Sequence, residues 1–232
     1  MSTTQSLTIL DKLRTRGHWL VTIRPATFRE ARVPCGDLFP IVEKSSVRLR
    51  GWDYPHVDRG SEPIREADSV GQDCDRDDTV EFWRFYTRGQ FAHRFGMSGD
   101  WRDRSNFWPA DEDWQPLRDL WYLDAIDTFP EIFEFAARLA LSEAGDARMH
   151  VEIKIRHLKG RRLVSELEGI FRSSDNYVTQ ADEWENHWEG SQVELIARPR
   201  ELAAERAQDL FDRFGGDVSL ETLARLQEGI GR

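Results

Sequence analysis

The stretch TVEFWRFYTRGQFAHRFGM, residues 79–97, gives the clearest indication of the fold in this sequence. Two runs rich in aromatic residues lie on either side of Arg88-Gly89, and a turn between two such runs is typical of a β-hairpin. The alternation within each run places most of the rings in a protein core. His93 is expected on the polar side of the hairpin. The stretch therefore predicts two antiparallel strands.

The stretch MHVEIKIRH, residues 149–157, predicts a further strand. Its apolar residues Met149, Val151, Ile153 and Ile155 alternate with polar ones, which is the period of a strand that buries one face. Other strands are expected at 18–25, at 46–55, at 117–128, in a segment returning after a turn at Lys159-Gly160, and at 191–199.

The strongest helix signal begins near Thr128. Thr128 and Glu131 have the spacing of a capping box, and Pro130 is tolerated in a first helical turn. Apolar residues at helical spacing then predict a helix over 129–142. Shorter helices are expected within 5–16 and 28–45, and a pair of helices at 199–230.

These elements predict an α+β fold, because strands outnumber helices and most neighbouring strands are joined by short turns. We expect a single antiparallel or mixed sheet of about six to eight strands, with helices packed mainly on one face. Residues 1–232 are expected to form one domain, with a mobile acidic loop near 58–78 and the C-terminal helical pair at 199–230.

The composition indicates a folded, strongly acidic chain. Charged residues make up 32% of it, yet it contains nine Trp and thirteen Phe, whereas disordered chains are poor in aromatic residues. The net charge of −10 disfavours general binding of nucleic acid.

The compartment predicted from the sequence is the cytoplasm. Cys35 and Cys74 are the only cysteines, and such a pair suits a reducing environment better than a disulfide framework. The first twenty residues lack the apolar core of a secretion signal. No stretch has the length and apolarity of a membrane span, so no membrane partner is expected.

The common catalytic motifs are missing from the sequence. It contains no HExxH pattern, no glycine-rich phosphate loop and no GxSxG elbow. These absences argue against the common zinc protease, nucleotide-hydrolysing and serine hydrolase classes. No cofactor is expected on this basis.

One short motif does have a catalytic parallel. Glu152 and Lys154 are similar to the acid-x-Lys half-motif of the restriction-type PD-(D/E)xK nucleases. The resemblance implies Mg²⁺ held by Glu152 and an upstream acid such as Asp124, with Lys154 orienting the attacking water. A divergent Mg²⁺-dependent nuclease is therefore the alternative function. A solvated sheet face explains the same alternation of charges without chemistry.

A candidate binding site lies in the stretch RGWDYPHV, at the end of the strand predicted over 46–55. Its chemistry-bearing residues are Arg50, Trp52, Asp53, Tyr54 and His56. Aromatic rings at such a place can stack on a planar ligand, while charged residues fix the polar atoms of the ligand. The rings can equally cap the sheet.

A second candidate is basic. The hairpin predicted around Lys159-Gly160 gathers Lys154, Arg156, Lys159, Arg161 and Arg162. In an acidic protein this reversal of charge can hold phosphates or an acidic partner, and it is the one place where nucleic acid is expected to bind. Exposed positive charge that keeps a sheet edge from pairing is the structural explanation.

Together these patterns favour a binding or interaction module over an enzyme. We expect an accessory subunit, or a protein that recognises a ligand or partner, within a bacterial multi-protein system. A protein partner or a small polar ligand would bind at the two candidate sites. The sequence leaves the identity of that partner, the oligomeric state and the pathway open.

Overall fold

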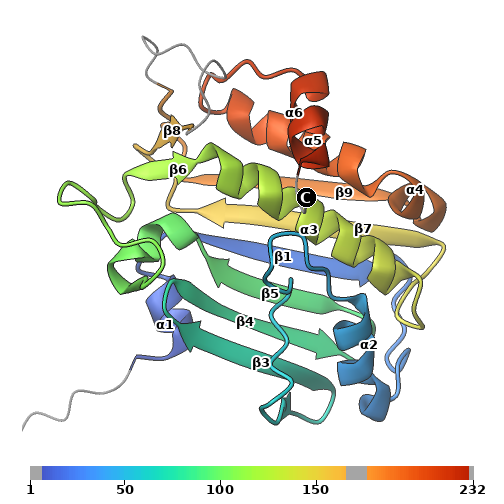
Figure 1. Cartoon of the computed structure of the whole chain (residues 1–232). Coiled ribbons are helices and arrows are strands. Elements are labelled where there is room, and N and C mark those ends of the chain that lie inside the picture. Colours follow the sequence, from blue (N-terminus) through green and yellow to red (C-terminus); the bar gives the residue numbers. More distant parts are fainter. Residues whose placement is uncertain (1–6, 166–176, 230–232) are drawn as a thin grey trace, which may run out of the picture.

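A computed structural model describes residues 7–165 and 177–229 and has one main sheet of seven strands (Figure 1). The strand order is β2-β3-β4-β5-β1-β7-β9, and all neighbours run antiparallel. The strands are β1 (His18–Pro25), β2 (Ile64–Arg65), β3 (Ser69–Arg76), β4 (Thr79–Tyr86), β5 (Phe91–Gly96), β7 (Arg148–Arg156) and β9 (Glu183–Ser191). A small parallel pair is formed by β6 (Asp119–Trp121) and β8 (Arg162–Val164). The predicted α+β fold is confirmed.

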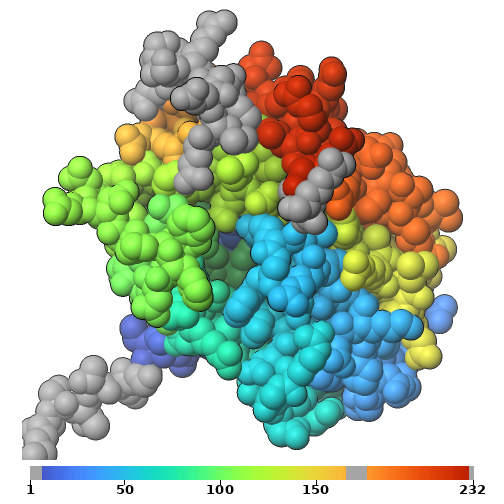
Figure 2. Space-filling view, viewed as in Figure 1, coloured from blue at the N-terminus to red at the C-terminus, as the bar shows by residue number. Residues whose placement is uncertain are grey.

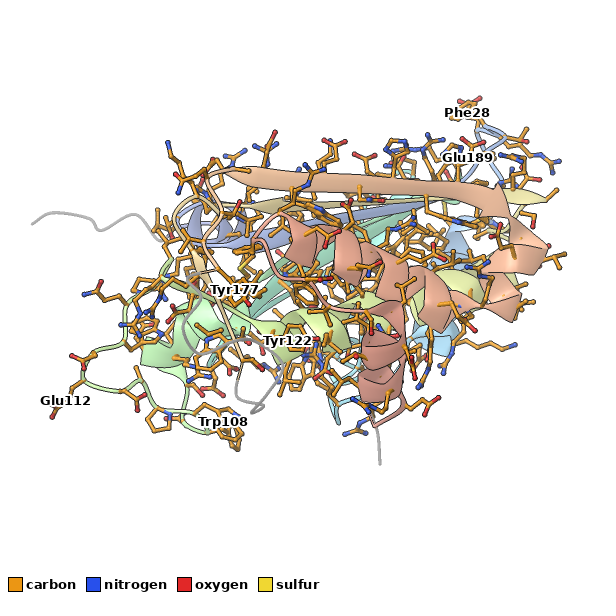
Figure 3. The ribbon with its side chains drawn as sticks, turned by 90° about the horizontal axis from the view of Figure 1, so that it is seen from above. Phe28, Trp108, Glu112, Tyr122, Tyr177 and Glu189 are labelled. Carbon is orange, nitrogen blue, oxygen red and sulfur yellow. The ribbon has the colours of Figure 1, made fainter. Side chains whose placement is uncertain are left out.

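Helices cover mainly one face of this sheet (Figure 3). They are α1 (Ile9–Leu13), α2 (Leu38–Ser45), α3 (Tyr122–Ala140), α4 (Gln192–Ala197), α5 (Pro199–Asp212) and α6 (Leu220–Glu228), with 3₁₀ turns at Cys35–Asp37 and Ser98–Arg104. The long α3 lies along the sheet, and α5 and α6 pack against it (Figure 1). Within the described residues, no helix has the length and apolarity to cross a membrane.

The core lies between α3 and the inner face of the sheet. On β7, Met149, Val151, Ile153 and Ile155 are all at most 1% exposed, which confirms the strand predicted there. The buried Val21 of β1 is the register partner of Ile153. Apolar side chains at period two on adjacent strands thus form one surface for α3.

The predicted hairpin is confirmed as β4 and β5. Gly89 ends the turn with φ of +83°, a conformation that side chains with a Cβ rarely adopt. One detail differs. His93 lies on the inner face beside Phe91 and Phe95 and is 1% exposed, so it is not on the polar side of the hairpin.

Helix α3 begins at Tyr122, earlier than the capping box predicts. The hydroxyl of Thr128 donates to the carbonyl of Asp124 inside the helix, at 2.7 Å. Pro130 is also internal and has no N–H for the carbonyl of Ile126. The tertiary burial of Ile126 and its neighbours outweighs this missing bond, so only 119–121 of the strand predicted over 117–128 is formed.

The strand predicted over 191–199 is wrong, because that region forms α4 and the start of α5. The strand at this edge is β9, and for most of its residues no strand is predicted from the sequence. Its inward positions include Trp184 and Trp188 but also Asn186 and Gly190. This mixture of large, polar and absent side chains hides the period of two.

The acidic segment 58–78 is not one loop, because it contains the strands β2 and β3. Residues 69–76 form β3, which pairs with β4 along its whole length. Its outward Asp73 pairs with Arg84 at 2.8 Å, and the buried Gln72 donates to the carbonyl of Asp58 at 2.7 Å. Ion pairs and hydrogen bonds stabilise this strand where apolar residues are few.

Two other predicted elements differ. Residues 46–55 form no strand; a single β-bridge joins Val47 to Tyr54. The segment after Lys159-Gly160 does not return along β7, because β8 pairs with β6 instead. The remainder of that predicted strand, from 166 to 171, lies outside the described residues.

Candidate functional site

A loop after α2 is held tightly against the inner face of the sheet. Val47 and Tyr54 exchange two backbone hydrogen bonds, at 2.8 and 3.0 Å. The Trp83 indole of β4 donates to the carbonyl of His56 at 2.8 Å. The ring of His56 stacks on Trp52 with their centroids 4.3 Å apart. These contacts give the loop a fixed position although it is not a strand.

A cavity of about 520 Å³ lies beneath this loop. Its walls come from β1, β4 and β5 on one side and from the N-terminal half of α3 on the other. In Figure 2 the surface is hollowed between the atoms around residues 46–60 and those around residues 98–115. The volume is within the range of small-molecule sites, which is roughly 300–1,000 Å³.

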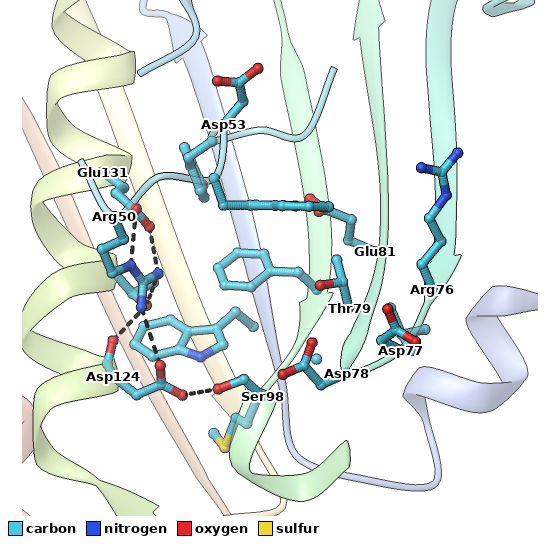
Figure 4. A pocket seen from close by; sticks show the side chains of 18 of the residues that line it. Arg50, Asp53, Arg76, Asp77, Asp78, Thr79, Glu81, Ser98, Asp124 and Glu131 are labelled. Atoms are coloured by element: carbon cyan, nitrogen blue, oxygen red, sulfur yellow. Dashed lines mark hydrogen bonds and ion pairs between the residues drawn. The ribbon is translucent and has the colours of Figure 1, made fainter. Parts of the chain in front are cut away.

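Arg50 joins the loop to α3 across this cavity (Figure 4). Its Nε and one terminal nitrogen donate to the two oxygens of Glu131 at 3.0 and 2.7 Å. The other terminal nitrogen donates to Asp124 at 3.1 Å, and the Ser98 hydroxyl donates to the second oxygen of Asp124 at 2.6 Å. Bidentate pairs of this kind impose geometry as well as energy, so the position of Arg50 in the cavity wall is well defined.

The hairpin brings a buried acid and a buried imidazole to the cavity wall. His93 Nε2 lies 2.6 Å from a carboxylate oxygen of Glu81, and the two side chains are 1% and 7% exposed. Among the described residues, neither His93 Nδ1 nor the hydroxyl of Tyr54 has a hydrogen-bond partner, and both atoms are buried. Buried polar atoms are nearly always hydrogen-bonded, and these two exceptions belong to residues that line the cavity.

Aromatic side chains form the outer part of the lining. Trp52, Phe107 and Trp108 all line the cavity and are 44%, 79% and 68% exposed. Large exposed rings around a concave site are typical of a surface that contacts another molecule.

Carboxyl groups dominate the charge of the site. The acidic residues of the lining are Asp53, Asp77, Asp78, Glu81, Asp124 and Glu131, and the basic ones are Arg50, Arg76 and His93. Burial raises the pKa of Glu131 despite the opposing effect of Arg50. Burial also raises the pKa of Asp78, and the negative charges of Asp124 and Asp77 add to this shift. Across residues 7–165 and 177–229, no group of three or more His, Cys, Asp and Glu side chains is placed to hold a metal ion.

Asp127, one turn along α3 from Asp124, should make the free energy of unfolding depend on pH. Burial raises its pKa from 3.8 to about 6, although Arg50 opposes the shift. The folded protein therefore holds this proton more tightly than the unfolded chain does, and stability falls as the pH rises from about 4 to about 6. We expect Asp127→Asn to increase the free energy of unfolding by about 1 kcal/mol at pH 7, after allowance for partial solvent exposure.

The gain should shrink towards zero at pH 4, where the wild-type carboxyl is already protonated in the folded state. Urea denaturation at the two pH values measures it. Asp212→Asn, at an exposed position of α5, is the control and should change little at either pH. A gain of equal size at pH 4 and pH 7 would contradict the assignment.

The structure brings most of the first candidate site together. Arg50, Trp52, Asp53 and Tyr54 line the cavity, and His56 supports Trp52 from behind. The alternative that these rings cover the sheet holds for Tyr54, which is buried and contacts His93 and Phe95 of β5.

The basic candidate site is not assembled as predicted. Lys154, Arg156 and Arg162 each form an ion pair with an acidic residue of the same or a neighbouring strand, at 2.9, 3.3 and 2.7 Å. Lys159 is exposed at the turn. Arg161 is 0% exposed and pairs with the buried Asp100. Because β8 pairs with β6 and one arginine is buried, these residues form no common basic surface on a hairpin.

The residues of the nuclease alternative lie on opposite faces of the sheet. Glu152 and Lys154 are outward positions of β7, between the buried Val151, Ile153 and Ile155. Asp124 is on α3, which covers the inner face, and it is bound there by Arg50 and Ser98. The sheet therefore separates the acids that would have to share one Mg²⁺, and this alternative is not supported.

Most of the other lining residues were not predicted as part of a site, among them the ionisable Asp78, Glu81, His93 and Glu131. The sequence does contain one signal for two of them, which is their position in the alternation of the hairpin. Glu81 and His93 occupy the same alternation as Trp83, Phe85 and Phe91, so two ionisable side chains lie at inward positions of an otherwise aromatic hairpin.

Comparisons with known proteins identified no relative of this chain. The chain matches no family model, no curated protein and no solved structure.

Proposed function

We propose that this protein binds a small polar ligand in the cavity beneath Arg50 and Tyr54. The observation that carries the proposal is that Tyr54 and His93 both line one cavity of about 520 Å³, and each has a buried polar atom, Oη or Nδ1, without a partner within the described residues. A buried donor or acceptor without a partner costs about 1–3 kcal/mol, and a bound ligand would remove that cost.

The surrounding contacts support a preformed site. Arg50, Glu131 and Asp124 connect the loop to α3 through three hydrogen bonds of 2.7–3.1 Å. A site that is already ordered loses less entropy when its ligand binds. Of the two kinds of partner expected from the sequence, a protein and a small ligand, a concave cavity with convergent polar groups favours the small ligand.

The test is a screen of a library of polar metabolites by ligand-observed NMR. We expect hits with the wild-type protein that are lost in Thr79→Phe, because Thr79 lines the cavity and a phenyl group there would fill it. Thr22→Phe is the matched control: Thr22 faces the other side of the sheet, in register with Glu152, and this variant should keep the hits.

Circular dichroism and thermal unfolding establish that both variants are folded. A screen without hits would contradict the proposal. Hits that survive in Thr79→Phe would also contradict it, because the ligand would then bind elsewhere.

A further inference from the structure

The charges of the cavity lining restrict the class of ligand. Both arginines of the lining are already ion-paired: Arg50 with Glu131 at 2.7 Å and with Asp124 at 3.1 Å, and Arg76 with Asp58 at 2.9 Å. An anionic ligand would have to compete with these carboxylates for the guanidinium groups. The lining therefore has no unpaired arginine with which to bind an anionic ligand.

Two acids of the lining, Asp77 and Asp78, form no ion pair with any of the described residues. No Lys, Arg or His of the described residues lies within 4.0 Å of the carboxylates of Asp77 or Asp78. Asp77 accepts one neutral hydrogen bond, from the amide of Asn106 at 3.1 Å. Asp78 lies at the turn between β3 and β4, and in Figure 4 its carboxylate points towards Ser98 and Asp124. Negative charge is thus left without a counter-ion at this end of the cavity.

Two further residues of the lining, His93 and Tyr54, each have a polar atom that can accept a hydrogen bond. The Glu81 carboxylate accepts from His93 Nε2 at 2.6 Å, which leaves a lone pair on Nδ1 when the imidazole is neutral. Nδ1 has no partner within the described part of the chain, and neither does the Tyr54 hydroxyl. Both side chains are more than nine-tenths buried. A ligand rich in N–H groups that reached these two atoms would satisfy them, and its other N–H groups would pair with the aspartates.

The aromatic walls suit a positive charge as well. Trp19, Trp52, Phe95 and Trp108 line the same space. The faces of such rings attract organic cations, and the attraction is worth about 0.5–2 kcal/mol depending on desolvation.

We propose that the ligand is a small organic cation bearing N–H donors, of the amidine, guanidine or amine class. The proposal rests on the proposed function and adds the chemistry of the ligand. The cation would lie against the aromatic wall with its N–H groups directed at Asp78 and His93. Its charge would be balanced by the carboxylates of Asp77 and Asp78 at the turn between β3 and β4.

The test is a titration with three probes of the same shape and different charge: benzamidinium, benzamide and benzoate. We expect benzamidinium to bind at least about tenfold more tightly than benzamide, and benzoate to bind most weakly. Isothermal titration calorimetry at pH 7 measures the three affinities. The preference for the cation should fall to about twofold or less in Asp78→Asn, whereas Asp217→Asn, which removes one charge at an exposed position outside the lining, should leave it unchanged.

Trp52→Leu is a second variant in case Asp78→Asn does not fold, and it should weaken benzamidinium more than benzamide. If benzoate or benzamide binds as tightly as benzamidinium, and this binding is lost in Thr79→Phe, the ligand is not specifically a cation. The proposed function would then stand, but this inference would be overturned. No binding by any of the three probes would also overturn this inference. The metabolite screen decides the proposed function separately.

Discussion

Replacing Arg161 with alanine is expected to lower the free energy of unfolding by about 3–5 kcal/mol. Arg161 is 0% exposed and donates to both carboxylate oxygens of Asp100, one of them at 2.9 Å. Asp100 also accepts from the backbone N–H of Gly17 at 2.7 Å and of Leu117 at 3.0 Å. Without the guanidinium, a buried carboxylate would keep these bonds but lose its counter-ion, which is why the loss is large.

Arg162→Ala is the matched control for this prediction. Arg162 is the next residue and its side chain is 47% exposed. Its partner Asp119 is 11% exposed but also pairs with Arg118, so removing Arg162 should cost only about 0–1 kcal/mol. Guanidinium denaturation followed by tryptophan fluorescence measures both variants. Equal losses for the two arginines would contradict the burial of the Arg161–Asp100 pair.

Replacing Tyr54 with phenylalanine is expected to act in opposite directions on stability and on binding. The Tyr54 hydroxyl is buried with no hydrogen-bond partner among the described residues, and burial raises its pKa well above the usual value. Its removal should increase the free energy of unfolding by about 1–3 kcal/mol. The same change should weaken the ligand roughly tenfold, because the bound state loses a hydrogen bond.

Tyr86→Phe provides the comparison, since Tyr86 is only half-buried and lies outside the cavity lining. It should change stability by less than about 0.5 kcal/mol and leave binding unaltered. Chemical denaturation and calorimetric titration give the two quantities. A Tyr54→Phe variant that loses stability would show that the hydroxyl is satisfied within the fold and would remove the main support for the site.

The parts of the fold that follow from the sequence are those where one face of an element is uniformly apolar. Strand β7 buries Met149, Val151, Ile153 and Ile155, and the period of two is visible without any structure. The same holds for the hairpin of β4 and β5, whose turn needs Gly89.

The missed elements are those whose inward face is mixed. Strand β9 places Asn186 between Trp184 and Trp188, and the Asn186 amide donates to Asp209 of α5 at 3.3 Å. Strand β3 depends on hydrogen bonds made by Gln72 and ion pairs made by Asp73. In both strands the stabilising partners lie far away in the sequence, so local periodicity carries no sign of them.

The candidate site divides in the same way. The cluster from Arg50 to Tyr54 is contiguous and could be found by inspection. Its other half comes from Glu81, His93 and Glu131, which meet only because α3 and the hairpin pack on each other. Conversely, Arg161 is close in sequence to exposed basic residues but is buried with Asp100, and composition alone does not separate a buried charge from a surface one.

The most direct measurement of the central claim is a ¹H–¹⁵N spectrum of the nine tryptophan indole groups during titration with the tightest hit of the metabolite screen. Three of these side chains, Trp19, Trp52 and Trp108, line the cavity, whereas Trp184 and Trp188 lie on β9. Binding beneath Arg50 and Tyr54 predicts saturable shifts of the first three resonances and stationary signals from the two tryptophans of β9. Saturable shifts confined to Trp184 and Trp188, or no shift at a saturating concentration, would contradict it.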